Sequence, residues 1–260
     1  MKNLIPHFLL FSLLLLLSIT LFYIYGKNIW YPYYKTYSYH DTIIPYNEPN
    51  TTITKEACKE CPKCSQEENL SSTQKLHRYL ADANFLIYPK NLTLIGLKHE
   101  RRLEVWSKKD GKNIHLVDYP FTAFSGILGP KFKEGDKQIP EGIYGISYLN
   151  PNSKFHLSLR VNYPNKFDKK MAKKEKRDNL GSDIMIHGSN RTIGCIPIGD
   201  DKIEELYLLA QKVGIQNIKV ILAPVDFRIM KVNITKKNKH PWLKDLYAEI
   251  KKEMKPFISK

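Results

Sequence analysis

A histidine and a cysteine eight positions apart are the residues of this chain best suited to do chemistry. The segment 183–198, DIMIHGSNRTIGCIPI, places Gly188 directly after His187 and Gly194 directly before Cys195. A thiol is only a few per cent ionised at neutral pH and needs a base nearby, for which histidine is the usual residue. The pattern is therefore typical of a cysteine nucleophile, Cys195, that is activated by His187.

The residues around Cys195 suggest how an acyl group would be held. Gly194 has no Cβ, so a carbonyl could approach the neighbouring thiol closely. The successive N–H groups of Ile193, Gly194 and Cys195 could stabilise a developing oxyanion. Arg191 is a candidate for contacting a substrate carboxylate, because guanidinium suits bidentate pairing. The alternative is a structural role, since a single cysteine is most often a small buried hydrophobe and a single histidine is more often structural than catalytic.

Regular elements on both sides would position this segment. The apolar run 184–186 predicts a buried strand that ends at His187. Apolar residues at helical spacing predict an amphipathic helix over 200–213, closed by Gly214. Further short strands separated by turn residues are expected at 92–97, 102–106, 114–119, 122–128, 143–149, 155–161 and 217–222. These features predict a mainly β fold, mostly antiparallel, as a sandwich or an open barrel with one prominent helix after the cysteine.

The N-terminal part of the chain differs in composition from the rest. Residues 1–25 hold an apolar run that is long enough to span a hydrocarbon core. A tyrosine-rich flank follows without a small-residue cleavage site, which favours an uncleaved signal anchor over a cleaved signal peptide. Residues 26–85 are expected to form a linker that ends in a short helix at 74–85 and contains the CxxCxxC run 58–64. That run fits a local disulfide, intermolecular pairing or metal ligation, in that order of preference.

Basic residues dominate the charge of the chain. The formal net charge is +15, and no nucleic-acid motif accompanies it, so membrane and cell wall are the favoured partners. The lysine-rich run 166–177 is interpreted as a solvated surface loop, with a cap beside the active site as the alternative. Residues 226–260 are expected to form a basic tail with helical spacing after 242. This tail would pack against the domain or lie on an anionic membrane.

The segment 183–198 resembles the active-site motif of the YkuD-type L,D-transpeptidase catalytic domain family (ErfK/YbiS/YcfS/YnhG). In that family a His-Gly pair precedes a Ser/Thr-x-Gly-Cys-hydrophobic run, which Thr192 to Ile196 occupy here. Upstream blocks in matching order resemble the YafK-like branch; they are 131–136, 140–144, 150–153, 155–158 and 163–165. Two positions depart from most members: Ile193 replaces a second histidine, and Pro197 replaces an arginine or asparagine. The YafK-like branch also lacks the second histidine.

The resemblance implies a YkuD-type β-sandwich or open barrel at 86–225 and an enzyme that acts on peptidoglycan stem peptides in cell-wall remodelling. Cys195 would attack the carbonyl of the diamino acid at stem position three and form a thioester. His187 would accept the thiol proton and later donate it to the leaving amine, while the Gly188 carbonyl orients the imidazole. The family requires no metal or organic cofactor.

Two outcomes stay open for the second step, and one alternative has no catalytic step at all. An amine would give transpeptidation, whereas water would make the chain a YafK-like hydrolase, an L,D-carboxypeptidase or an amidase that releases wall-bound lipoprotein. A non-catalytic wall-binding module is the third possibility. The apolar run at 1–25 predicts a single-pass anchor in the inner membrane. The substrate class predicts that the catalytic domain lies in the periplasm.

Overall fold

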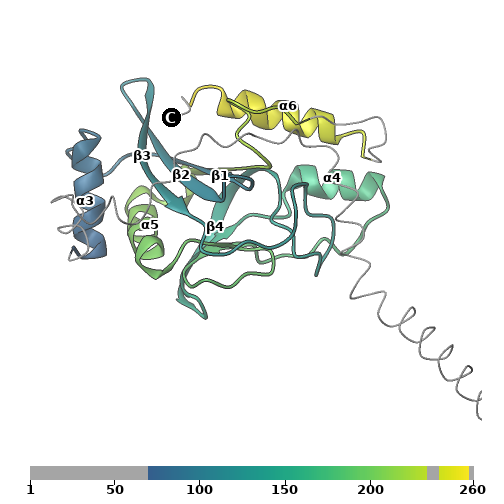
Figure 1. The fold of residues 1–260 in the computed structure, drawn as a ribbon, viewed down its shortest axis with the longest axis horizontal. Coiled ribbons are helices and arrows are strands. Elements are labelled where there is room, and N and C mark those ends of the chain that lie inside the picture. The colour runs from purple at the N-terminus through teal and green to yellow at the C-terminus, as the bar shows by residue number, and fades with distance from the viewer. Residues whose placement is uncertain (1–69, 233–239, 258–260) are drawn as a thin grey trace, which may run out of the picture. The chain divides into compact units, whose positions relative to one another are not determined.

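A computed structural model describes residues 70–232 and 240–257, which fold around one eight-stranded sheet (Figure 1). The order of the strands across the sheet is β3-β2-β1-β8-β4-β5-β6-β7. The strands are β1 (Leu92–Leu97), β2 (Arg102–Lys109), β3 (Lys112–Pro120), β4 (Gly142–Ser153), β5 (His156–Val161), β6 (Met185–His187), β7 (Ile196–Pro197) and β8 (Ile218–Ala223). The helices are α3 (Ser72–Asp82), α4 (Lys166–Lys174), α5 (Asp200–Val213), the short 3₁₀ helix η2 (Ile215–Asn217) and α6 (Leu243–Met254).

Antiparallel pairing dominates the sheet. Five neighbouring strand pairs are antiparallel, and only β1–β8 and β6–β7 are parallel among the described strands. The β2–β3 hairpin turns at Asp110 and Gly111, which both have positive φ angles, of 49° and 80°. A turn with two left-handed residues suits the right-handed twist of a hairpin. The predicted mainly β fold is therefore confirmed.

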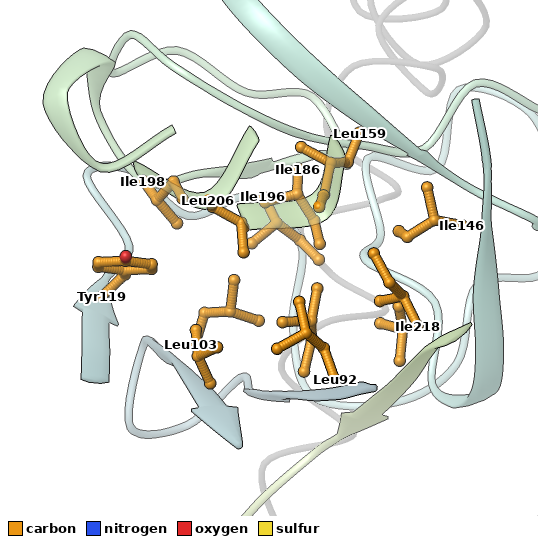
Figure 2. Close-up of a cluster of buried hydrophobic side chains, with 14 of the residues drawn as sticks. Leu92, Leu103, Tyr119, Ile146, Leu159, Ile186, Ile196, Ile198, Leu206 and Ile218 are labelled. Atoms are coloured by element: carbon orange, nitrogen blue, oxygen red, sulfur yellow. The ribbon is translucent and has the colours of Figure 1, made fainter. Parts of the chain in front are cut away.

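The two halves of the sheet face each other across the main core (Figure 2). Leu92, Leu103 and Ile218 come from β1, β2 and β8 on one side. Leu159, Ile186 and Ile196 come from β5, β6 and β7 on the other, and all six side chains are 4% exposed or less. Strand β4 links the halves, because it pairs with both β8 and β5. This arrangement agrees with the expected sandwich or open barrel.

The central strands are buried on both faces. In β8, Ile218, Val220 and Leu222 point into the main core, whereas Ile221 and Ala223 belong to a second apolar cluster. This alternation is the period of two that a strand imposes on its side chains. Helix α6 covers the second cluster and buries its whole apolar face there (Figure 1), through Leu243, Leu246, Tyr247, Ile250 and Met254. The apolar face of the C-terminal helix therefore packs against the domain, and the membrane alternative is wrong for that face.

More than one helix supports the sheet. Helix α5 has the predicted bounds and places Ile203, Leu206 and Ala210 in the main core. Helix α3 packs beside it and adds Leu76 and Leu80 to the same core. Helix α5 is the expected helix after the cysteine, and α3 and α6 lie where a short helix at 74–85 and helical spacing after 242 were predicted. Helix α4 is the one α-helix of the described residues that was not expected.

The interpretation of 166–177 as a loop is wrong, because most of this run forms α4. Asn165 caps the helix, and its side chain accepts from the Asp168 N–H at 3.0 Å. Asp168 reciprocates by accepting from the Asn165 N–H at 2.9 Å, which completes a capping box. Met171 and Ala172 are buried, while the lysines face solvent. The lysine-rich run contains a narrow apolar stripe, and this stripe is sufficient to bury one face of a short helix.

The strand predicted at 122–128 is also absent, and a loop replaces it. Its hydrogen bonds go to other loops and to Pro197 of β7, without forming a strand ladder. Thr122 donates from N to Pro197 O at 2.9 Å and from Oγ1 to Ser189 O at 2.7 Å. The Ile127 N–H donates to Gln138 Oε1 at 3.0 Å, and Gly126 has a φ of 78°. This segment therefore supports the candidate site from outside the sheet.

The predicted anchor at 1–25 and the CxxCxxC run 58–64 lie outside the described residues. Among residues 70–232 and 240–257, no helix combines the length and the apolar character needed to cross a membrane. The same residues contain no group of three or more histidine, cysteine or acidic side chains that could hold a metal ion.

Candidate active site

The parallel pair of β6 and β7 brings the two candidate catalytic residues onto one face of the sheet. Ile186 pairs with Ile196 in register, and His187 pairs with Pro197. Ile186 and Ile196 both point into the main core (Figure 2). Side chains alternate along a strand, so His187 lies on the opposite face. Cys195 directly precedes β7, and the same alternation places it on that face too.

The Cys195 thiol is held by the backbone that leads into β6. Its Sγ accepts from the Met185 N–H at 3.4 Å and donates to the Asp183 carbonyl at 3.5 Å. The residue is half-buried. Burial raises the pKa of the thiol, and the negative charge of Asp183 raises it further, whereas the Met185 N–H and the positive charge of Lys131 act in the opposite direction. The resting cysteine is therefore a neutral thiol.

His187 is fully buried, at 1% exposure, and only one of its two ring nitrogens is engaged. Nδ1 lies 2.5 Å from the Gly188 carbonyl oxygen. A carbonyl only accepts, so Nδ1 carries the hydrogen and Nε2 presents its lone pair. Nε2 has no hydrogen-bond partner in this structure. The Phe155 ring stacks on the imidazole with 4.7 Å between ring centroids.

Burial lowers the pKa of His187, and the hydrogen bond to the Gly188 carbonyl partly offsets this effect. The same desolvation raises the pKa of Cys195. Both shifts favour a neutral pair over a thiolate–imidazolium pair. The geometry therefore suits a general base that removes the thiol proton as the thiol attacks, rather than a thiolate formed in advance.

Gly188 occupies a position that a larger residue cannot fill without movement. A Cβ there would lie 2.4 Å from Asp200 Oδ1 and 2.8 Å from the Phe155 carbonyl oxygen. Asp200 Oδ1 already accepts from the Ser189 N–H at 2.6 Å. Gly188 is thus enclosed between the turn that precedes β5 and the first residue of α5.

Thr192 organises the backbone of the motif loop. Its Oγ1 accepts from the Cys195 N–H at 2.8 Å and from the Gly194 N–H at 3.1 Å, and it donates to the Cys195 carbonyl at 2.7 Å. Two of the three amides predicted to form an oxyanion hole are therefore bonded to Thr192 in this structure. Gly194 has a φ of 127°, a conformation that suits glycine, and a Cβ there would lie 3.1 Å from the Gln138 carbonyl oxygen.

A second loop, residues 129–139, lies against the motif at Gly194. The Asp136 carboxylate ties this loop together, because it accepts from Lys131 Nζ at 2.6 Å and from the Phe132 N–H at 2.8 Å. Beneath the loop, the fully buried Lys98 donates from Nζ to Gly129 O at 2.6 Å, to Ile139 O at 2.9 Å and to Glu141 Oε1 at 2.8 Å. A buried ion pair thus fixes both ends of the loop that carries Lys131.

The other predicted site residues lie at the surface of the motif. Ile193 is 79% exposed beside the nucleophile. Arg191 is exposed and makes no hydrogen bond or ion pair with the described residues. The structure therefore brings His187, Gly188, Thr192, Gly194 and Cys195 together and leaves Arg191 and Ile193 facing solvent.

Sequence analysis assigned no role to several residues that shape the site. Asp183 and Met185 hold the thiol through backbone atoms, so their residue types carry no signal of that contact. Phe155 lies beside His187 because β5 and β6 pair, which requires knowledge of the strand register. The alternation of apolar and polar residues along β5 is the sequence signal that could have found Ser158. It separates Leu159 in the core from Ser158 on the face that carries His187.

Comparison with known proteins identifies a family for the segment that contains the sheet. Residues 94–222 match the family model described as "YkuD: L,D-transpeptidase catalytic domain". The matched range contains all eight strands except the first two residues of β1 and the last residue of β8, as well as His187 and Cys195. Residues 94–222 therefore belong to the YkuD family of L,D-transpeptidase catalytic domains.

Curated relatives support the same family. The chain is 31% identical over 160 residues to "Putative L,D-transpeptidase YafK" of Escherichia coli strain K12, and the same values hold for the protein of that name in strain O157:H7. The match covers 59% of this chain and 61% of each relative. The chain thus spans about three fifths of the length of the curated relatives it matches.

Solved structures with similarity to the chain include the helical cell shape determining protein Pgp2 from Campylobacter jejuni. That match has 23% identity, covers 64% of this chain and 59% of Pgp2, and has a TM-score of 0.44. Bd1075 from Bdellovibrio bacteriovorus matches at 22% identity, with 65% and 56% coverage and a TM-score of 0.40. L,D-transpeptidase 1 of Mycobacterium tuberculosis matches at 13% identity, with 51% and 62% coverage and a TM-score of 0.31.

Proposed function

We propose that this chain is a cysteine-dependent L,D-transpeptidase that acts on the stem peptides of peptidoglycan. The observation that carries the proposal is the state of His187. Its Nδ1 is committed to the Gly188 carbonyl, and its Nε2 presents a free lone pair on the face of the sheet that also carries Cys195. Family membership of residues 94–222 supplies the substrate class.

The proposed first step forms a thioester on Cys195. Sγ attacks the carbonyl carbon of the diamino acid at stem position three, and the thiol proton moves to His187 Nε2. The C–N bond to the next residue then breaks, and the leaving amine takes that proton from His187. In the second step an acceptor amine attacks the thioester carbonyl and gives a proton to His187, which passes that proton to the departing Sγ. The thiol proton lost to the leaving amine in the first step is thus restored in the second.

Backbone amides are the proposed stabilisers of the oxyanion. The Cys195 and Gly194 N–H groups donate to Thr192 Oγ1 in this structure. When the oxyanion forms, they would donate to it in place of Thr192 Oγ1 or in addition to it. The exposed Ile193 lies next to these amides and is placed to contact the stem peptide. Arg191, exposed in the same loop, is the proposed contact for a stem carboxylate.

The proposed location follows from the substrate. Peptidoglycan lies outside the inner membrane, so the catalytic domain would work in the periplasm, with residues 1–25 as a single-pass anchor. Wall-linked lipoprotein is a possible second substrate, because water in place of an amine would release it.

The test is incubation of the full-length chain with purified muropeptides, read by mass spectrometry beside Cys195→Ala. Cross-linked dimers or exchanged terminal residues that vanish in the variant are the expected result. Shortened stems or released lipoprotein remnants alone would identify a hydrolase instead. The absence of any Cys195-dependent product would favour a non-catalytic wall-binding module.

A further inference from the structure

Ser158 lies directly across the sheet from His187. The two residues pair in register between the antiparallel strands β5 and β6. Their neighbours Leu159 and Ile186 point into the main core, so Ser158 and His187 share the opposite face. Side chains of directly opposed residues lie next to each other, with Cβ atoms roughly 4.5–5.5 Å apart.

Both of these side chains are buried and both end in a polar atom without a partner. Ser158 and His187 are each 1% exposed. Among the described residues only three buried side-chain atoms lack a hydrogen bond, namely Ser158 Oγ, His187 Nε2 and Glu100 Oε2. A buried polar group without a partner is costly and uncommon in folded proteins. That two of the three belong to one cross-strand pair indicates a shared interaction.

A hydroxyl suits both protonation states that His187 takes during the reaction. Nε2 is an acceptor in the neutral ring, because Nδ1 holds the hydrogen that Gly188 accepts. Nε2 becomes a donor once it has taken the thiol proton. A serine hydroxyl can donate to the first form and accept from the second by rotating its hydrogen, with no movement of the ring.

We propose that Ser158 is a positioning residue for His187 and that one buried water joins its hydroxyl to Nε2, because the two atoms make no direct hydrogen bond. In the resting protein this water donates to the Nε2 lone pair, and it gives up that position when the thiol approaches. After proton transfer the water, held by the Ser158 hydroxyl, accepts from the charged ring and stabilises it until the leaving amine takes the proton. The inference rests on the proposed function only in giving His187 the role of base.

Charged groups near Ser158 and His187 lie on β5, on α5 and in the segment before β6. Several of them form ion pairs with each other. Arg160 on β5 pairs with Asp183 before β6 at 2.9 Å, and His156 pairs with Glu204 of α5 at 2.7 Å. Asp200 of α5 accepts from the Ser189 N–H, and the Cys195 thiol donates to the Asp183 carbonyl. Ser158 is thus a neutral polar side chain that pairs in register with His187 across the two strands.

The test is an NMR titration of His187 in the full-length chain with labelled histidine, its signal being assigned with His187→Gln. We expect Ser158→Ala to lower the pKa of His187 by about one unit, which makes it a roughly tenfold weaker base. Ser158→Thr keeps the hydroxyl and should hold the pKa within a few tenths of a unit. Ser107→Ala is the matched control, because it removes another buried serine hydroxyl, one that donates to Asn91 O at 2.8 Å on the distant strand β2.

An unchanged His187 pKa in Ser158→Ala, or an equal shift in Ser107→Ala, would overturn the proposal. If Ser158→Ala does not fold, Ser158→Cys keeps the side-chain volume while weakening the hydrogen bond, and it is judged by the same shift. The titration needs no substrate, so its outcome is separate from that of the muropeptide experiment. A chain without Cys195-dependent products could still show the coupling, and an active enzyme could lack it.

Discussion

The side chain of Thr192 closes around the backbone of Cys195. Oγ1 accepts from the Cys195 N–H at 2.8 Å and donates to the Cys195 carbonyl at 2.7 Å. A single hydroxyl therefore satisfies both backbone groups of the candidate nucleophile. This contact fixes the direction in which Cys195 enters β7, and with it the placement of the thiol near Asp183 and Met185.

Removal of this hydroxyl should loosen the motif loop. Thr192→Val keeps the shape of the side chain but loses three hydrogen bonds, so we expect a loss of roughly 1–3 kcal/mol in the free energy of unfolding. Cys195-dependent turnover should fall more than this loss of stability implies, because the thiol would no longer be held in one place. Urea denaturation and muropeptide turnover measure the two effects. Thr192→Ser retains the hydroxyl and should restore both, and failure to do so would assign the effect to packing.

Alkylation of Cys195 should report its protonation state. The thiol has a pKa raised above the ordinary value of 9.0, so little thiolate exists at neutral pH. We expect the rate of reaction with iodoacetamide to be low at pH 7 and to keep rising beyond pH 9, as followed by mass spectrometry of the Cys195 peptide. His187→Ala should leave this profile nearly unchanged, because the resting pair is neutral. A plateau reached between pH 6 and pH 7 would instead indicate a preformed ion pair.

Gly188→Ala should disturb His187 without touching it directly. The added Cβ would meet Asp200 Oδ1 at 2.4 Å and the Phe155 carbonyl at 2.8 Å, so the backbone that carries the orienting carbonyl must move. We expect a fall of at least about tenfold in Cys195-dependent turnover, since a misplaced base loses general-base catalysis. Gly145→Ala on β4 is the control, because its nearest atoms would lie 3.6 Å away. Equal effects of the two substitutions would argue against a special role of Gly188.

Sequence patterns located the elements better than the contacts between them. The strand at 92–97 and the helix at 200–213 have their predicted bounds, because a short apolar run typical of a buried strand and apolar residues at helical spacing are both visible in the sequence. The segment 122–128 is also rich in apolar residues, but it forms a loop whose hydrogen bonds go to other loops and to Pro197 of β7, which no local pattern can show. Likewise, His187 and Cys195 were visible as residue types, whereas Ser158 depends on the register of β5 against β6.

Protonation of Asp168 should link stability to pH. Burial raises its pKa to about 6, against an ordinary value of 3.8. Between these values the folded state holds a proton that the unfolded chain has lost, so stability falls as pH rises from 3.8 to 6, by at most about 3 kcal/mol. Asp168→Asn removes the buried charge, and its side chain can still accept from the Asn165 N–H.

We therefore expect Asp168→Asn to be more stable than the original chain at pH 7.5, by about 1–3 kcal/mol, and to lose this part of the pH dependence. Urea denaturation at pH 4.5 and pH 7.5 measures both effects. Asp110→Asn, at an exposed turn, should change neither value by more than about 0.5 kcal/mol. A larger loss of stability in Asp168→Asn at pH 7.5 than at pH 4.5 would contradict the expected sign.

The buried pair of Lys98 and Glu141 should couple stability to the site. Lys98→Met leaves the Glu141 carboxylate buried with only the Gly129 N–H and the Tyr247 hydroxyl as hydrogen-bond partners. An uncompensated buried charge of this kind costs roughly 3–5 kcal/mol of stability. The double variant Lys98→Met with Glu141→Gln should recover part of that loss, because glutamine can still accept from the Gly129 N–H without carrying a charge. Urea denaturation of the single and double variants measures both terms.

The matched control for this pair is Lys219→Met, which breaks an exposed ion pair with Glu253 and should cost less than about 1 kcal/mol. Lys98 also holds the carbonyls of Gly129 and Ile139, at the two ends of the loop that lies against Gly194. Turnover by Lys98→Met should therefore fall even under conditions where the variant is fully folded, whereas Lys219→Met should keep its turnover. If the two lysine variants lose equal stability and equal turnover, the buried pair does not support the loop beside Cys195.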